Sequence, residues 1–161
     1  MAAGVLFFNQ RGELLIIKPS YKDHWSIPGG VAELDESPVD AAVRETKEEI
    51  GLKVARQKLK LLTIEYASRR PNGLGDSLQF VFSGGLLGLK EIQNIVSHLE
   101  RQKNQKMVSG IEQPEVSEYK FVKAEDAPLL FSEWSRPRIV ASLKALKNKR
   151  FPIYLENGKE I

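Results

Sequence analysis

The sequence predicts a mixed α/β domain, and three observations support this fold class. Short apolar runs have the length and composition of strands, one segment carries the start and stop signals of a helix, and the closing segment has helical spacing. The chain has 161 residues, of which 42% are hydrophobic and 28% charged. This is enough for one domain over residues 1–161 with a sizeable core, in which strands and helices pack in layers.

The first elements are expected to be strands. Apolar runs at residues 5–8 and 14–17 flank a loop that contains Gly12, which predicts a β-hairpin buried on both faces. Pro28-Gly29-Gly30 follows and is expected to form a turn. Three further strands are expected, at residues 60–67, 77–82 and 119–123.

The clearest helix is expected to begin after Ser37 and to end near Ile50. Ser37 is a good N-cap, Pro38 suits the first helical position, and Asp40 completes a capping-box pattern. Gly51 is the expected C-terminal stop.

Two more helices are expected. Residues 134–149 have an apolar stripe, and the arginines and lysines between Arg136 and Arg150 are expected on its exposed side. Residues 89–106 have helical spacing and lie in a predicted helical insertion at about 87–110. This insertion is interpreted as a lid, a dimer contact or a specificity element, or as a helix that simply packs on the sheet.

Composition excludes several classes of function. A formal net charge of +3 does not indicate a nucleic-acid binder, although it is compatible with an anionic small molecule. The absence of cysteine excludes disulfides, zinc–thiolate sites and a catalytic thiol. No apolar segment has the length of a membrane span, and the first residues do not resemble a signal peptide, so a cytoplasmic protein without membrane contacts is expected.

Acidic residues are concentrated in the Ser37 helix. At ~100° per residue, Glu45, Glu48 and Glu49 fall within an arc of roughly 100° beside the expected core face. The core face is expected to contain Val39, Val43, Thr46 and Ile50, and the solvent face Asp40, Arg44 and Lys47. Like charges this close repel, and partial burial increases the cost, so the cluster calls for a cation. Mg²⁺ prefers such oxygen ligands. The alternative is a solvated glutamate-rich face, and from the helix alone that alternative is favoured.

The spacing around the helix changes this balance. Gly30 is followed after five residues by Glu36, after seven more by Arg44-Glu45, and then by Glu48-Glu49 and Gly51-Leu52. This pattern resembles the Nudix hydrolase signature, Gly-x5-Glu-x7-Arg-Glu-U-x-Glu-Glu-x-Gly-U, in which U is aliphatic. All its fixed charged and glycine positions match, and Thr46 stands where an aliphatic residue is usual. The resemblance implies a Nudix-like α/β/α sandwich with a central mixed β-sheet.

The resemblance also implies a chemistry and a set of roles. It implies hydrolysis of a pyrophosphate bond in a nucleoside triphosphate, or in a nucleoside diphosphate linked to another moiety, with Mg²⁺ or its substitute Mn²⁺. Glu45, Glu48, Glu49 and the Gly30 carbonyl match the metal ligands, and Arg44 matches a residue that orients a glutamate. Glu36 is expected to brace the loop. The proton acceptor is a box glutamate such as Glu48 or an acid of a later loop. Glu115 is preferred there over Glu112 and Glu118, although a solvated charge is the simpler reading for each.

Substrate contacts are less well defined by the sequence. Arg69 and Arg70 could meet phosphate, and Trp25, Tyr21 and Tyr66 could stack on a base, although solvated arginines and core aromatics are the simpler interpretations. A small nucleotide is the expected partner, nucleic acid is disfavoured, and a homodimer is left open. Two other functions compete: hydrolysis at the 5′ end of RNA, and nucleotide sensing without turnover.

Overall fold

The computed structural model describes residues 1–68, 75–109 and 114–161, with the backbone alone described for residues 105–109. These residues form an eight-stranded mixed sheet in which β3 pairs with β1 beside the main order β6-β2-β1-β5-β4-β7-β8. Its strands are β1 (Ala2–Phe8), β2 (Glu13–Pro19), β3 (Gly29–Val31), β4 (Lys60–Ala67), β5 (Ser77–Leu86), β6 (Val116–Lys123), β7 (Ile153–Glu156) and β8 (Lys159–Glu160).

The strand β1 organises the sheet. It pairs antiparallel with β2, which confirms the predicted hairpin, and it runs parallel to β5. Because β5 pairs along the whole of β1, β3 shares the edge of β1 on which β2 pairs: Gly29 lies opposite Gly4 and Gly30 opposite Ala3, whereas β2 pairs further along at Phe8. The prediction of a turn at Gly29-Gly30 is therefore wrong. A Cβ on Gly29 would lie 2.2 Å from the Ala3 carbonyl oxygen, so glycine is needed here for close approach of two strands.

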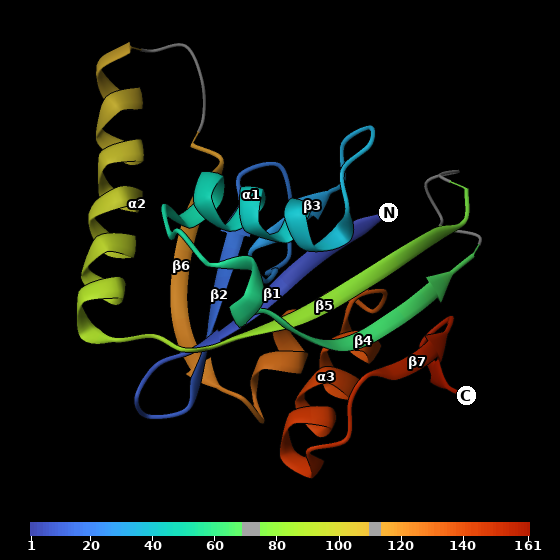
Figure 1. The fold of residues 1–161 in the computed structure, drawn as a ribbon. Helices are drawn as coiled ribbons and strands as arrows, with labels where there is room; N and C mark the ends of the chain where they lie inside the picture. Colours follow the sequence, from blue (N-terminus) through green and yellow to red (C-terminus); the bar gives the residue numbers. More distant parts are fainter. Residues whose placement is uncertain (69–74, 110–113) are drawn as a thin grey trace.

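Three α-helices cover the sheet, which gives the expected α/β/α sandwich (Figure 1). They are α1 (Pro38–Ile50), α2 (Leu89–Ser109) and α3 (Arg136–Asn148), and two short 3₁₀ helices, η1 (Arg56–Lys58) and η2 (Ala127–Leu130), lie in the connections. Val5 and Phe7 of β1 pack in one core cluster with residues of α1 and α2. Leu6, between them, packs in the second cluster with Ile139 of α3. Alternation along the strand thus builds one core on each face.

The ends of α1 lie where the sequence predicts them. The Ser37 Oγ accepts a hydrogen bond from the Asp40 backbone N–H at 3.3 Å, and Gly51 is left-handed with φ 71°. The expected faces of the helix need correction. Arg44 does not point to solvent, because its side chain is only 23% exposed and is fully engaged in ion pairs.

The buried face of α1 is also shifted from the expected one. Its buried residues are Ala41, Ala42, Thr46, Glu49 and Ile50. Val39 and Val43 are only half-buried. The buried face is therefore formed by two small alanines and a glutamate, together with Thr46 and Ile50, and the larger valines lie at its border. Across the described ranges, no helix has both the length and the apolarity needed to cross a membrane.

Candidate active site

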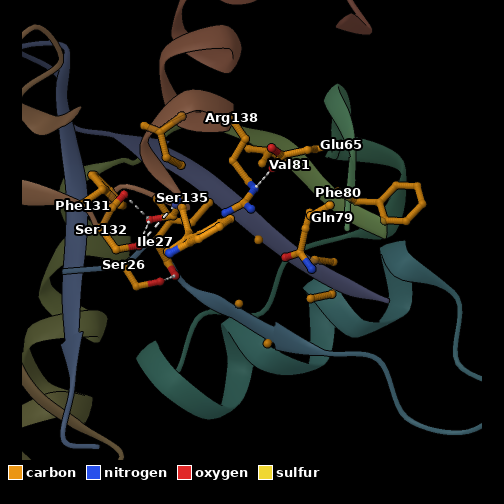
Figure 2. A pocket seen from close by; sticks show the side chains of 18 of the residues that line it. Ser26, Ile27, Glu65, Gln79, Phe80, Val81, Phe131, Ser132, Ser135 and Arg138 are labelled. Carbon is orange, nitrogen blue, oxygen red and sulfur yellow. Dashed lines mark hydrogen bonds and ion pairs between the residues drawn. The ribbon is translucent and has the colours of Figure 1, made fainter. Parts of the chain in front are cut away.

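A cleft of about 900 Å³ opens across the sheet between α1 and the segment that leads into α3 (Figure 2). One wall carries Gly29, Gly30, Glu45 and Glu49. The floor is formed by β1, β4 and β5, and the opposite wall by residues 131–139. The cleft thus places the glutamate helix at one end of a cavity large enough for a nucleotide-sized ligand.

Arg44 holds the acidic residues of α1 in place. Its Nε and Nη2 donate to the two oxygens of Glu36 at 2.9 Å each, which is a bidentate pair. Its Nη1 donates to Glu45 Oε1 at 2.8 Å and to Glu48 Oε2 at 2.9 Å. These hydrogen bonds raise the pKa of Arg44, and the bond to Glu36 contributes most. The hydrogen bond from Arg44 also lowers the pKa of Glu36. Glu36 therefore holds Arg44, and within the loop that it was expected to brace it accepts a hydrogen bond from the Glu33 backbone N–H at 2.9 Å. Arg44 in turn contacts two of the predicted metal ligands.

Glu49 is the most unusual residue of the cleft. It is only 2% exposed, and its Oε2 accepts a hydrogen bond from the Gly29 backbone N–H at 2.7 Å. Burial raises the pKa of this carboxyl to about 8, with the charges of Glu45 and Glu115 adding to the rise. An ionised carboxylate in this position is costly without a cation near it.

Gly30 faces Glu45 across the cleft wall. A Cβ on Gly30 would lie 2.3 Å from Glu45 Oε1, so any other residue would push the carboxylate away. This close approach brings the backbone of β3 to the carboxylate, as the predicted shared metal site requires. It gives a physical reason for glycine at this position of the motif.

The donor set fits a hard divalent cation. It consists of carboxylate and carbonyl oxygens, and one carboxylate is buried with a raised pKa. Among the residues that the structure describes, no three acidic or histidine side chains converge on one point as they stand. Instead, Arg44 Nη1 pairs with both Glu45 and Glu48. A bound cation would share these two carboxylates with Arg44 or take them from it.

The three candidate proton acceptors outside α1 lie in different places. Glu115 lines the same cleft and its charge contributes to the raised pKa of Glu49 and Tyr21. Glu118 instead lies on β6 and pairs with Lys18 at 3.5 Å. Glu112 lies outside the described residues. The structure thus brings Glu115 into the neighbourhood of the α1 glutamates.

The residues predicted to contact substrate differ in where they lie. Arg69 and Arg70 lie outside the described residues. Trp25 packs against the second core cluster, and the Lys120 Nζ lies 4.3 Å from the centroid of its ring. One face of this ring is therefore occupied by a protein cation. Tyr21 lines the cleft mouth and is 71% exposed.

Several cleft residues were missed in the sequence. Arg138 was expected on the exposed side of its helix, but its side chain is only 13% exposed and forms an ion pair with the buried Glu65 of β4 (Figure 2). The serines 132 and 135 share a hydrogen bond at 2.9 Å in the same wall. Lys22 and His24 line the mouth. Glu65 at an inward position of a strand was the one signal that could have indicated a buried partner.

Fold and cleft together define an α/β/α sandwich whose glutamate helix flanks a nucleotide-sized cavity. The family model described as NUDIX domain matches residues 1–143. The chain therefore belongs to the Nudix family, as its signature indicated.

Individual relatives agree with this assignment over shorter segments. The chain is 41% identical over 49 residues to an RNA pyrophosphohydrolase of Marinomonas sp., a match that covers 30% of each chain. It is 42% identical over 57 residues to a MutT-like protein of Streptomyces ambofaciens, covering 35% of this chain and 36% of the relative. The chain thus matches about a third of the length of these curated relatives.

A solved structure resembles the whole fold. The dihydroneopterin triphosphate pyrophosphohydrolase of E. coli superposes with a TM-score of 0.62 at 20% identity, covering 91% of this chain and 94% of that one. At this identity the likeness shows the fold alone.

Proposed function

We propose that the protein hydrolyses a pyrophosphate bond in a nucleoside triphosphate, or in a nucleoside diphosphate linked to another moiety, with the help of Mg²⁺. The observation that carries the proposal is the buried Glu49 at the cleft wall, with a pKa raised to about 8 and Glu45 beside it. A protein that uses this position only for packing would gain stability from an apolar residue there. Family membership supports the same conclusion, and all the fixed charged and glycine positions of the motif are occupied.

In this proposal Glu45, Glu48, Glu49 and the Gly30 carbonyl hold the metal. When bound, Mg²⁺ neutralises the substrate phosphates, polarises the bond to be broken and lowers the pKa of a water. Arg44 keeps Glu45 and Glu48 oriented through its 2.8 and 2.9 Å contacts, while Glu36 fixes Arg44 from the other side. Glu115, or one of the helix glutamates such as Glu48, accepts the proton of the attacking water. We prefer Glu115 because it lies in the cleft and is exposed enough to exchange its proton with solvent.

The rest of the cleft is assigned to the substrate. Tyr21, Lys22 and His24 line the cleft, and we assign them to contacts with the phosphates or the sugar. The far end, with Ser132, Ser135 and Arg138, offers polar groups to the nucleoside or its conjugate. Arg69, Arg70 and Trp25 stay predictions as substrate contacts.

A second candidate acts on the 5′ end of RNA, which is favoured by the name of the Marinomonas relative. The net charge of +3 argues for small nucleotides instead, since RNA binding depends on phosphate neutralisation by clustered cations. The third candidate, a nucleotide sensor without turnover, is disfavoured by the complete set of box glutamates.

A substrate panel with Mg²⁺ tests the proposal. It should contain nucleoside triphosphates, ADP-ribose and other nucleotide sugars, dinucleoside polyphosphates, coenzyme A and a 5′-triphosphorylated RNA oligomer. We expect Mg²⁺-dependent cleavage of at least one small nucleotide, abolished by chelation. Faster cleavage of the RNA, with a steep decrease at high salt, would favour the second candidate. Thermal stabilisation by a nucleotide without cleavage at any metal concentration would establish the sensor and overturn the proposal.

A further inference from the structure

The helix α2 docks directly on the end of the glutamate helix (Figure 1). Ile95 and Leu99 of α2 are each 1% exposed and pack in the same core cluster as Ile50 of α1. His98, on the same side of α2, covers Gly51, the residue that ends α1. A Cβ on Gly51 would lie 2.5 Å from the His98 ring, so glycine serves both the left-handed turn and the room for the imidazole.

This contact reaches the backbone of a predicted metal ligand. The Nε2 of His98 lies 3.2 Å from the Glu48 carbonyl oxygen, and the Nε2 of Gln102 lies 3.3 Å from the same oxygen. Glu48 is in the last turn of α1, where carbonyls have no intrahelical donor. The side chains of α2 therefore supply the missing cap.

Two proton arrangements are compatible with this cluster, since His98 Nε2 and Gln102 Nε2 are 2.9 Å apart. With the ring proton on Nδ1, Gln102 donates to both the ring and the Glu48 carbonyl. With the proton on Nε2, the single ring N–H is shared between the Glu48 carbonyl and the oxygen of a flipped Gln102 amide. The Glu48 carbonyl is capped in both arrangements.

We propose that His98 and Gln102 are positioning residues that fix the last turn of α1, with Glu48 and Glu49, and through it Glu45 one turn earlier, in the geometry that binds the metal. This rests on the proposed function. The same turn is held at the cleft by the 2.7 Å bond from Gly29 to Glu49, and by Arg44 through the Glu48 side chain. The α2 contact is the third restraint, from the opposite side. The predicted insertion is thus part of the support for the metal site.

The test measures Mn²⁺ binding to the full chain. Binding is detected as a decrease in the EPR signal of free Mn²⁺. Because either residue alone keeps one donor, His98→Ala and Gln102→Ala should each weaken Mn²⁺ binding by about twofold or less. The double variant should weaken it about tenfold, at the lower end of what outer-shell partners of metal ligands contribute. A second double variant, Gln102→Ala with His98→Gln in place of His98→Ala, should bind Mn²⁺ within about twofold of the unchanged protein, because the new amide at position 98 carries a donor.

The control is Ile92→Ala, a residue of α2 that packs on the same core but is not among the groups that contact the Glu48 carbonyl. It should lower the melting temperature without changing Mn²⁺ affinity. The proposal is overturned if the double variant binds Mn²⁺ as tightly as the unchanged protein, or if Ile92→Ala weakens binding equally at a similar loss of stability. If the unchanged protein binds no Mn²⁺, the proposed function fails first and takes the positioning role with it.

Discussion

The helices α1 and α3 cover opposite faces of the sheet and differ in how they use charge. Each spans 13 residues and has proline in its first turn. In α1, Arg44 links Glu45 and Glu48 of the same helix to Glu36 of the preceding loop, and Glu49 is buried in the cleft wall. In α3, Arg138 is the charged residue paired inward, with Glu65 of β4. One wall of the cleft is therefore built from local sequence, whereas the other is joined to the floor by a pair of residues 73 positions apart.

This difference separates two kinds of contribution. The α1 wall has the spacing of a family motif, and we assign it the chemistry. The α3 wall has no such spacing, and we assign it to substrate selection. Variants on each wall should then have different consequences.

The largest effect is expected on the α1 wall. Glu49→Gln should lower kcat about 100-fold or more on the best substrate of the panel, since it removes a proposed metal ligand whose contribution should at least match that of outer-shell partners. Glu48→Gln should act in the same direction. Glu125→Gln, at an exposed acid that does not line the cleft, is the control and should leave turnover unchanged. Normal turnover in both Glu48→Gln and Glu49→Gln would remove these residues from the metal site.

The α3 wall should respond mainly in stability and specificity. Arg138→Met leaves the carboxylate of Glu65 buried without this ion pair and should lower the free energy of unfolding by about 3 kcal/mol. Changing both residues to methionine should recover most of that loss, and denaturant unfolding measures both values. If the pair also contacts substrate, the double variant will remain stable while its preference within the panel changes. An unchanged substrate profile would make the pair purely structural.

The pKa of Glu49 gives the metal-free protein a pH dependence of defined sign. The folded-state value of about 8 exceeds the ordinary 4.5, so the folded state holds this proton more tightly than the unfolded state. The resulting stabilisation is complete below 4.5 and is lost as the pH rises to about 8. In EDTA, the melting temperature should therefore fall less between pH 5.5 and 8.5 in Glu49→Gln than in the unchanged protein. Parallel curves for the two proteins would show that the carboxyl is not perturbed.

The smallest effect concerns the one departure from the family motif. Thr46 is fully buried, and its hydroxyl has no hydrogen-bond partner within the described residues. Thr46→Val should stabilise the protein by about 1 kcal/mol, because it removes an unsatisfied polar group at nearly constant volume. Denaturant unfolding of the two proteins gives this difference directly. A loss of stability would indicate that the hydroxyl has a partner in solution.

Features that depend on residues close together in the sequence are the ones that the sequence predicts correctly. The hairpin, the two ends of α1 and the motif positions follow from neighbouring residues, and each of these elements is present. Gly29-Gly30 was misread because a glycine pair is typical of turns, whereas here it permits close packing of β3 on β1. The helical spacing predicts Arg44 on the solvent face because it takes account only of residues within the helix. Glu36, which binds Arg44, lies in the preceding loop.

The contacts made by the α3 wall depend on the order of the strands in the sheet. Glu65 meets Arg138 only because α3 packs across β4, which no spacing within either segment indicates. The same holds for His98 and the carbonyl of Glu48, which are 50 residues apart. The helix of residues 89–106 was recognised from its periodicity, but its docking site was not.

The most direct test of the central claim is a crystal structure with Mg²⁺ and a non-hydrolysable nucleotide. We expect octahedral metal density between the phosphates and Glu45, Glu48 and Glu49, with the Gly30 carbonyl among the ligands. Phosphates bound elsewhere in the cleft, with these carboxylates still held by Arg44 and Gly29 and no metal beside them, would contradict the proposed chemistry.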